Sequence, residues 1–375
     1  MTTTETNVRL FASPRSWIEG EAVRQLYATA ELEGVQRAVG FPDLHAGRGA
    51  PVGAAFVTEG VIYPQLIGGD IGCGMALFKT DLLRRKARHD RWAELRFDLE
   101  HPWEGDGREH LAASRLHTTA FDDAMGTIGS GNHFAEVQAV EEIFDASGMR
   151  HIGLGREQLV VLVHSGSRGL GDPMLRDYVD EHHGAGAPVE SDAAENYLSG
   201  HDFAVCWAEA NRALIAQRFL AALGAEGERA WDGVHNSVSR RQGDGASLWV
   251  HCKGAVCADA PFVVIPGSRG TLSYLVKPTS DGESHAWSLA HGAGRKWARS
   301  ESRSRMRERF AVSELVQTPL GGSVICEERQ LLYEEAPAAY KNIEAVIQDL
   351  VDAGLVSVVA TFRPLLTYKT RKQRR

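Results

Sequence analysis

The sequence predicts an α+β fold in which mixed β-sheets, flanked by helices, surround a central metal-lined cleft. Apolar or β-branched runs such as Leu159–Val163 stop abruptly at glycine-rich turns. Histidine-bearing turns of this kind recur between residues 70 and 300 with no proline- or serine-rich linker between them. One site gathered from the whole chain explains this pattern more simply than several independent loops, so we expect one intertwined domain over residues 1–375.

The composition is that of an ordinary globular protein, with 43% hydrophobic and 24% charged residues. The N-terminal MTTTETNVRLF lacks the basic-then-apolar order of a signal peptide, and no apolar run approaches the ~18 residues of a membrane span. Five scattered cysteines argue against a disulfide framework and for a reducing compartment. We therefore expect a cytoplasmic protein without a membrane partner.

The net charge of −8 argues against a general nucleic-acid coat protein. Two local strips are nevertheless basic: Arg295–Arg309 has seven Lys/Arg against two Glu, and Lys369–Arg375 has five positive charges. Either strip could hold a polyanion, or could be a solvated helix face and a frayed tail. We expect the tail to be disordered over about residues 370–375.

The heptapeptide Gly68–Gly74, GGDIGCG, puts Asp70 and Cys73 three residues apart among glycines that permit a sharp bend. A carboxylate and a thiolate turned toward one point suit zinc, manganese or iron better than calcium or magnesium. The alternative is a glycine-rich turn with a buried cysteine. VIYPQLI, residues 61–67, is predicted to be the strand that leads to this turn.

Four more stretches carry histidines, each at a glycine turn or a strand end. In GSGNHFAEV, Asn132 and His133 precede an apolar pattern, and His133 is either a metal ligand or an ordinary surface residue. His164 ends the Leu159–Val163 run, and Arg168 in the following Gly/Ser turn suits a phosphate. The turn lacks the Lys-Ser/Thr ending of a P-loop.

Residues 41–57 are predicted to be a ligand-presenting or merely connecting loop that carries Asp43. A core helix is predicted over residues 199–223, capped by Ser199 and ended by Gly224, with Cys206 in its apolar stripe. His235 follows this helix, and the strand LWVHCKGAV places His251 and Lys253 on one face.

In SLAHGAGRKWARS, residues 288–300, a helix that began near His291 would align His291, Arg295 and Arg299 on one face. Such a histidine could attack phosphorus to form a phosphoramidate while the arginines hold the charged oxygens. The alternative is a basic amphipathic helix with an incidental histidine. Further on, Pro337 is predicted to open a helix that Gly354 ends, and VSVVATF to be a strand.

Taken together, these motifs resemble the RtcB family of RNA ligases. PDLHAGRGAPVG, GGDIGCG, GSGNHFAEV, VHSGSRGLG, VHCKGA, PGSRGTLSYLV and HGAGR occur in this order between about residue 40 and Lys369. The resemblance implies an enzyme that uses GTP and two Mn²⁺ ions to join an RNA 3′-phosphate or 2′,3′-cyclic phosphate end to a 5′-hydroxyl end. It also implies a guanylyl-histidine intermediate.

The resemblance also assigns roles to residues at matching positions. The two-manganese centre would take as ligands Asp70, Cys73, His133, His164 and His235, with Cys73 bridging. His291 would be the nucleophile, with Asp43 close to it. Phosphate-binding positions are matched by Asn132, Arg168, Lys253 and Arg299. Contacts on the guanosine side are matched by Glu136, Ser268, Ser273, Tyr340 and Lys369.

The chain departs from the common RtcB pattern in three respects. It is shorter between GGDIGCG and GSGNHFAEV, it has Arg269 where a smaller or apolar residue is usual, and TRKQRR follows the motif lysine. These features resemble the short branch encoded beside a peptide-release-factor homologue. That resemblance implies repair of cleaved tRNA or rRNA, with an archease-like activator or the release-factor homologue as partner.

Two readings from other classes remain open on the sequence. One is a dinuclear-metal phosphodiesterase or phosphatase that opens cyclic phosphates without ligating, which needs the metals but not His291. The other is a non-catalytic RNA-binding module that uses the basic helix and tail, and whose binding would weaken steeply with salt.

Overall fold

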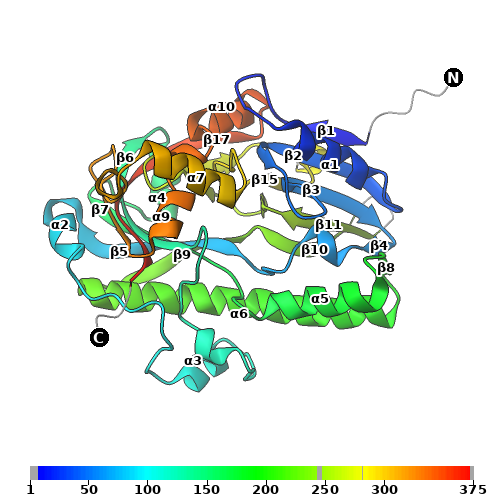
Figure 1. Ribbon diagram of the computed structural model, residues 1–375, viewed down its shortest axis with the longest axis horizontal. Coiled ribbons are helices and arrows are strands. Elements are labelled where there is room, and N and C mark those ends of the chain that lie inside the picture. The colour runs from blue at the N-terminus through cyan, green and yellow to red at the C-terminus, as the bar shows by residue number, and fades with distance from the viewer. Residues whose placement is uncertain (1–6, 243–246, 281, 372–375) are drawn as a thin grey trace.

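The computed structural model describes residues 7–242, 247–280 and 282–371, and it has mixed β-sheets flanked by helices, as predicted (Figure 1). Within these residues one sheet has the order β1-β2-β3-β11-β10, and a larger one has the order β13-β14-β17-β6-β7-β5-β9 with β16 paired to β17. The first sheet therefore pairs strands from the beginning and the middle of the chain, and the larger sheet pairs β17, near the end of the chain, with β6 from its first half.

The first sheet is antiparallel except for its parallel β1–β2 pair. Its strands are β1 (Val8–Leu10), β2 (Val35–His45), β3 (Val52–Glu59), β11 (Ser247–Lys253) and β10 (Asn236–Gln242). The region from residue 41 to residue 45 thus belongs to β2, and the predicted loop is confined to the residues between β2 and β3. Asp43 consequently sits near the end of a strand.

The larger sheet is covered on both faces, which explains the unbroken apolar run of its central strand. Leu159, Val161 and Val163 pack in the same cluster as Ile215 and Phe219 of α6, whereas Val160 and Leu162 pack on the other side. Its strands are β5 (Gly74–Leu83), β6 (Phe134–Ile143), β7 (Gln158–Ser165), β9 (Gly227–Val234), β13 (Val263–Ile265), β14 (Ser273–Pro278), β16 (Ser323–Cys326) and β17 (Val356–Thr370).

The long helix α6 (Asp192–Leu223) lies along one side of the molecule (Figure 1). It ends at Gly224, in the left-handed region with φ 67°, as predicted. It begins earlier than predicted, because Ser191 rather than Ser199 accepts a hydrogen bond from a first-turn backbone N–H. Cys206 is exposed rather than part of the core.

The remaining elements are shorter. The helices are α1 (Gly20–Ala30), α2 (His89–Trp92), α3 (Gly107–Ala113), α4 (Ala146–Ile152), α5 (Gly171–His182), α7 (Arg299–Arg309), α8 (Val312–Leu315), α9 (Arg329–Glu334) and α10 (Ile343–Asp352). The short strands are β4 (Val61–Ile62), β8 (Ala187–Pro188), β12 (Ala255–Cys257) and β15 (Ser288–Ala290). Among the described residues, no helix is both long and apolar enough to cross a membrane.

Three predicted elements differ from the structure where proline or glycine intervenes. The predicted strand over residues 61–67 is only β4, followed by a 3₁₀ turn that Pro64 opens. No helix begins at His291, because Gly292 and Gly294 lie in a loop that lasts until α7 begins at Arg299. Pro337 opens only a 3₁₀ turn, and α10 begins at Ile343.

The C-terminal strand also extends further than expected. β17 continues through Lys369 to Thr370, and Arg371 donates to the backbone carbonyls of Ala93, at 3.1 Å, and Leu95. The prediction that the chain is disordered from about residue 370 is therefore wrong for these two residues. Residues 372–375 lie outside the described part of the chain.

Candidate metal centre and adjoining cavity

Cys73 lies where two groups of metal-type donors meet. It precedes β5 in a turn whose Gly72 has φ 75°, and a Cβ there would come 2.8 Å from the Ala208 Cβ of α6. The Sγ atom is 3.4 Å from His133 Nε2 and 3.3 Å from His164 Nε2. The thiol is therefore buried at a point that two imidazoles already face.

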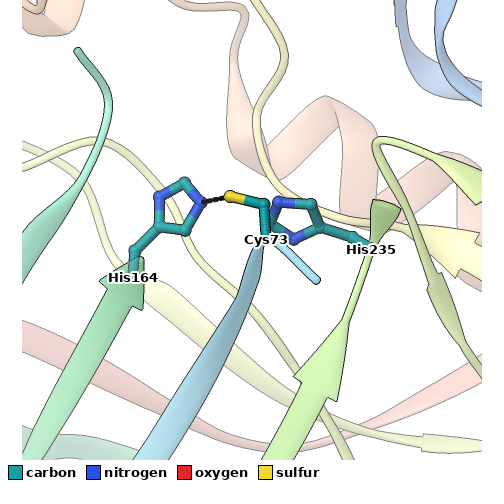
Figure 2. Close-up of side chains that lie close together, drawn as sticks. All are labelled: Cys73, His164 and His235. Atoms are coloured by element: carbon teal, nitrogen blue, oxygen red, sulfur yellow. Dashed lines mark hydrogen bonds between the residues drawn. The ribbon is translucent and has the colours of Figure 1, made fainter. Parts of the chain in front are cut away.

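The structure brings all five predicted metal ligands together in two sets that share this sulfur. Donor atoms of Cys73, His164 and His235 lie within 4.8 Å of one another, as do those of Asp70, Cys73 and His133. Figure 2 shows the first set, with His164 at the end of β7, Cys73 before β5 and His235 between β9 and β10. The three side chains thus lie together at the adjacent ends of the neighbouring strands β7, β5 and β9.

Backbone carbonyls orient two of the imidazoles. His133 Nδ1 lies 3.0 Å from the carbonyl oxygen of Ile128, and His164 Nδ1 lies 3.2 Å from that of Asn132. Since a carbonyl only accepts, Nδ1 carries the proton and each Nε2 lone pair faces Cys73. Burial lowers the pKa of His164 and of His235 well below the ordinary value, so both imidazoles are neutral, as a metal ligand must be.

The donor set fits a divalent cation. Asp70 Oδ1 is buried and has no hydrogen-bond partner among the described residues. Burial, and then the negative charge of Asp70, raise the pKa of the Cys73 thiol well above its ordinary value. A bound cation would offset both effects by holding thiolate and carboxylate together. Nitrogen, oxygen and sulfur donors in one site suit manganese or zinc better than calcium or magnesium.

Two polar residues of α6, which the sequence analysis missed, hold the turns that carry these ligands. Arg212 is fully buried, donates from Nη1 to the carbonyls of Gly72 (2.7 Å) and Ser165 (3.0 Å), and forms an ion pair with Asp232. Asn211 donates to Ser165 Oγ at 3.2 Å. The available signal was a pair of adjacent polar residues within the apolar stripe of the predicted helix.

His291 stands beside this centre and is held by Asp43. Its Nδ1 lies 2.7 Å from Asp43 Oδ2, its backbone N–H donates to the same oxygen at 3.2 Å, and Asp43 is fully buried. Because a carboxylate accepts, Nδ1 is protonated and Nε2 keeps its lone pair. The ring centroid is 4.9 Å from that of His235. A Cβ at Gly294 would lie 2.3 Å from the Asp43 carbonyl oxygen, so this turn requires glycine.

His291 opens onto a cavity of about 640 Å³, a size suited to a small-molecule ligand. Eight of the predicted site residues line it: Asn132, Glu136, His164, Ser268, His291, Arg299, Tyr340 and Lys369. Arg295, expected beside His291 to hold charged oxygens, also lines it, as do residues without a predicted site role such as His45, Arg48, Arg269, Trp297 and Glu335. The predicted metal centre and the predicted nucleotide contacts therefore border one space.

Buried carboxylates and cations alternate at the far end of the cavity. Glu136 accepts hydrogen bonds from Gln138 Nε2, at 2.5 Å, and from Thr367, and burial raises its pKa to about 7. Burial lowers the pKa of Lys369 to about 8, and its Nζ has no hydrogen bond or ion pair with a described residue. Ser273 does not line the cavity; it accepts a hydrogen bond from Gln138 at 3.0 Å behind Glu136.

Arg295 also lies at this end of the cavity. It does not share the predicted helix face with His291, because no helix contains both residues. It donates to Glu335 at 2.9 Å, and its guanidinium carbon lies 5.3 Å from the ring centroid of Tyr340. Tyr340 in turn donates to Glu335. Nothing in the sequence marked Glu335, because its partners come from segments 5 and 40 residues away.

The four predicted phosphate-binding residues do not share one place. Arg299 Nη2 donates to Asn132 Oδ1 at 3.4 Å inside the cavity. Arg168, with φ 59°, donates to Thr127 Oγ1 at 3.2 Å, and Lys253 donates to the carbonyl of Arg48 at 2.9 Å; neither lines the cavity among the described residues. Burial lowers the pKa of Lys253 to about 8. His251 is structural, since its Nε2 accepts from the backbone N–H of Tyr63.

Fold and site together define a mixed α/β protein with a candidate metal centre and an oriented histidine at the mouth of a ligand-sized cavity. The family described as tRNA-splicing ligase RtcB matches residues 25–121 and 98–370. The chain belongs to the RtcB family.

Curated relatives resemble the chain over nearly its whole length. It is 46% identical to the RNA-splicing ligase RtcB2 of Escherichia coli (strain ATCC 25922) over 358 residues, which cover 96% of this chain and 94% of the relative. It is 30% identical to the tRNA-splicing ligase RtcB of Archaeoglobus fulgidus, covering 93% and 91% of the two chains. That alignment extends over 439 positions, more than the 375 residues of this chain, in keeping with its predicted shortness.

Proposed function

We propose that this protein is a GTP- and Mn²⁺-dependent RNA ligase. It would join an RNA end carrying a 3′-phosphate, or a 2′,3′-cyclic phosphate after its hydrolysis, to a 5′-hydroxyl end. The observation that carries the proposal is the pair formed by His291 and the buried Asp43, next to the five-ligand cluster and facing the cavity. Family membership and the ligase names of the relatives support the same reaction class.

The pair supplies a nucleophile with a defined reactive atom. Asp43 fixes Nδ1–H of His291, so Nε2 attacks the α-phosphorus of GTP, a P–N bond forms, and the bond to the leaving pyrophosphate breaks. The same carboxylate stabilises the positive charge that develops on the ring. Arg299 and Asn132, which share a hydrogen bond on the cavity wall, are placed to contact phosphate oxygens.

The following two steps consume the guanylyl group. An oxygen of the RNA 3′-phosphate attacks the guanylyl phosphorus, the P–N bond breaks, and His291 is regenerated. The 5′-hydroxyl oxygen then attacks the RNA phosphorus, its proton is released, and GMP leaves as the phosphodiester forms. Asp70, Cys73, His133, His164 and His235 would hold two manganese ions, which when bound polarise phosphate oxygens.

The charged end of the cavity is the proposed guanosine subsite. Glu136 offers carboxylate oxygens to N–H donors of guanine, and Lys369 offers an ammonium to an acceptor. Ser268 and Tyr340 line the same space, while Ser273 would act through Gln138. The reaction would take place in the cytoplasm on cleaved tRNA or rRNA, within a single catalytic domain. An archease-like activator or a release-factor homologue is the proposed partner.

Intact mass after incubation with GTP and Mn²⁺ tests the nucleotidyl step. We expect the wild-type protein to gain one GMP and His291→Ala to gain none. His182→Ala, which changes a half-buried histidine of α5 outside the cavity lining, is the control and should gain GMP. If manganese is bound but the wild type gains no GMP, either the activator is missing or the proposal gives way to a cyclic phosphodiesterase or phosphatase.

A further inference from the structure

Helix α7 (Arg299–Arg309) leads from the cavity to a second, strongly basic groove. Arg299, its first residue, lines the cavity, and Arg303 and Arg307 follow at intervals of four residues on the same face. Arg303 Nη1 donates to Gln330 Oε1 of α9 at 2.9 Å, so the two helices border each other there. Figure 1 shows α7 beside α9. A continuous line of guanidinium groups therefore runs outward from the cavity.

The groove lies between α7, α8 and α9 and has a volume of about 1120 Å³. Its lining includes four arginines, Arg303, Arg307, Arg309 and Arg329, against the single carboxylate of Glu308. Two aromatic side chains, Phe310 and Tyr333, also line it. Such a combination of cations and aromatic faces suits a strand of nucleic acid.

Three of these arginines have no counter-ion within the part of the chain that the structure describes. Arg307, Arg309 and Arg329 are exposed and form no ion pair with a described residue. On the same helix, by contrast, Arg305 is paired with Glu301 at 2.7 Å and lies over Trp297 at 4.8 Å. Arg307, Arg309 and Arg329 thus keep their charge available, although Arg309 lies over the ring of Phe310 at 5.2 Å. Arg303, in the same lining, is paired with Glu334 at 3.6 Å.

The sign of the charge selects the partner. The whole chain carries a net charge of −8, so general electrostatics repel a polyanion and only a local excess of cations can hold one. From Arg299 to Arg309 the helix rises by about 15 Å, enough to follow a few nucleotides of extended strand. Continuity with the His291 cavity requires that such a strand end at the reacting phosphate.

We propose that this groove binds the single-stranded RNA segment that adjoins the end being joined. The proposal rests on the ligase function and adds where the substrate strand lies outside the cavity. Phosphates would contact Arg303, Arg307, Arg309 and Arg329, and bases would stack on Tyr333 and Phe310. Binding by the groove therefore depends on RNA length, while guanylylation of His291 does not.

The test compares two triple variants that lose the same charge. The groove variant carries Arg307→Gln, Arg309→Gln and Arg329→Gln. The control variant carries three substitutions of exposed arginines on α1, β9 and β10, none of which lines the groove: Arg24→Gln, Arg229→Gln and Arg240→Gln. Affinity for a fluorescent 12-nucleotide RNA ending in a 3′-phosphate is measured over a range of salt concentrations, and adduct formation is measured by intact mass.

We expect the groove variant to bind this RNA roughly tenfold or more weakly, and the slope of log affinity against log salt to fall by about 2, at ~0.7 per lost phosphate contact on a single strand. The control should keep the wild-type slope, and all three proteins should form the GMP adduct equally. A dinucleotide substrate should be joined equally well by all three.

Equal RNA affinity and equal salt slopes in the groove and control variants would overturn the proposal and leave the groove to an acidic protein partner. Arg329→Glu, a single change on α9, provides an independent check and should weaken RNA binding while the adduct still forms. If the wild type forms no adduct but the groove variant still loses RNA affinity, the ligase function fails and the RNA surface stands.

Discussion

The two ends of the His291 cavity are built in different ways. One end of the cavity adjoins the candidate metal centre, and we call it the metal end. There, imidazoles are oriented by backbone carbonyls, as His133 is by Ile128 and His164 by Asn132. At the charged end, the proposed guanosine subsite (hereafter the guanosine end), side chains orient one another, as Gln138 does for Glu136. The first end thus depends on the course of the backbone, whereas the second depends on the identity and charge of neighbouring side chains.

The two ends also differ in how they respond to protons. Burial keeps His164 and His235 neutral far into the acid range, so their state is constant near neutrality. Glu136, with a pKa raised to about 7, and Lys369, with a pKa lowered to about 8, both titrate close to neutrality. His164 and His235 are therefore constant near neutrality, and the charged end of the cavity, the proposed guanosine subsite, is where groups titrate close to it.

The largest expected effect comes from the atom that the two donor sets share. Cys73→Ala removes Sγ from both sets, so we expect both manganese ions and the GMP adduct to be lost. Loss of an outer partner alone costs about 10–100-fold in metal affinity, and loss of a shared ligand should exceed this. Metal content after dialysis against Mn²⁺ measures the effect, with the exposed Cys206→Ala as control. Full metal content in Cys73→Ala would show that the sulfur is not a ligand.

A smaller loss is expected when the metal end is kept but the nucleophile is misoriented. Asp43→Asn can present an N–H to Nδ1 of His291 and favour the wrong tautomer, which in Ser-His-Asp sites costs up to ~10⁴-fold in rate. We expect adduct formation to slow by about 10²–10⁴-fold, with manganese content unchanged. Rapid-quench measurement of the adduct separates rate from extent. An unaltered rate would remove Asp43 from the mechanism.

The same contrast explains which parts of the site could be predicted from the sequence. The predicted ligands stand in glycine turns at strand ends, and periodicity together with motif spacing locates such turns, as for Cys73 and His164. Likewise, β7 is buried on both faces, as its unbroken apolar run predicts. Features that depend on the course of the backbone could therefore be predicted from the sequence.

Contacts between side chains of distant segments could not be predicted from the sequence. Glu335 meets Arg295 only because a loop, rather than the predicted helix, follows His291. Arg212 braces Gly72 across 140 residues of sequence. No local pattern encodes such partners, because the pairing is set by how sheets and helices pack rather than by nearby residues.

At the guanosine end we expect a change of base selectivity rather than loss of chemistry. Glu136→Gln keeps the shape and the contact with Thr367 but removes the charge that guanine N–H donors would meet. A hydrogen bond to a charged group is worth ~1.5–3 kcal/mol, so the preference for GTP over ATP in adduct formation should fall by roughly 10–100-fold. Glu142→Gln, which removes the same charge from an exposed residue of the same strand outside the cavity lining, is the control. Unchanged selectivity in Glu136→Gln would place guanosine elsewhere.

The smallest expected effect is the pH dependence of GTP affinity, which should be greatest between about pH 7 and pH 8. Below about 7, Glu136 gains a proton and loses its charge, so affinity falls; above about 8, Lys369 loses its proton, so affinity falls again. Each limb should approach about a tenfold change per pH unit when one proton controls it. The KM for GTP in adduct formation, measured from pH 6 to pH 9, reports both limbs.

Single variants assign each limb to its residue. Glu136→Gln should flatten the acid limb and leave the alkaline one, whereas Lys369→Met should flatten the alkaline limb. Lys369→Met should also move the acid limb to higher pH, because the positive charge of Lys369 helps to lower the pKa of Glu136. A double variant that still showed both limbs would show that neither Glu136 nor Lys369 is the titrating group. The charged end of the cavity would then not be the source of the pH dependence.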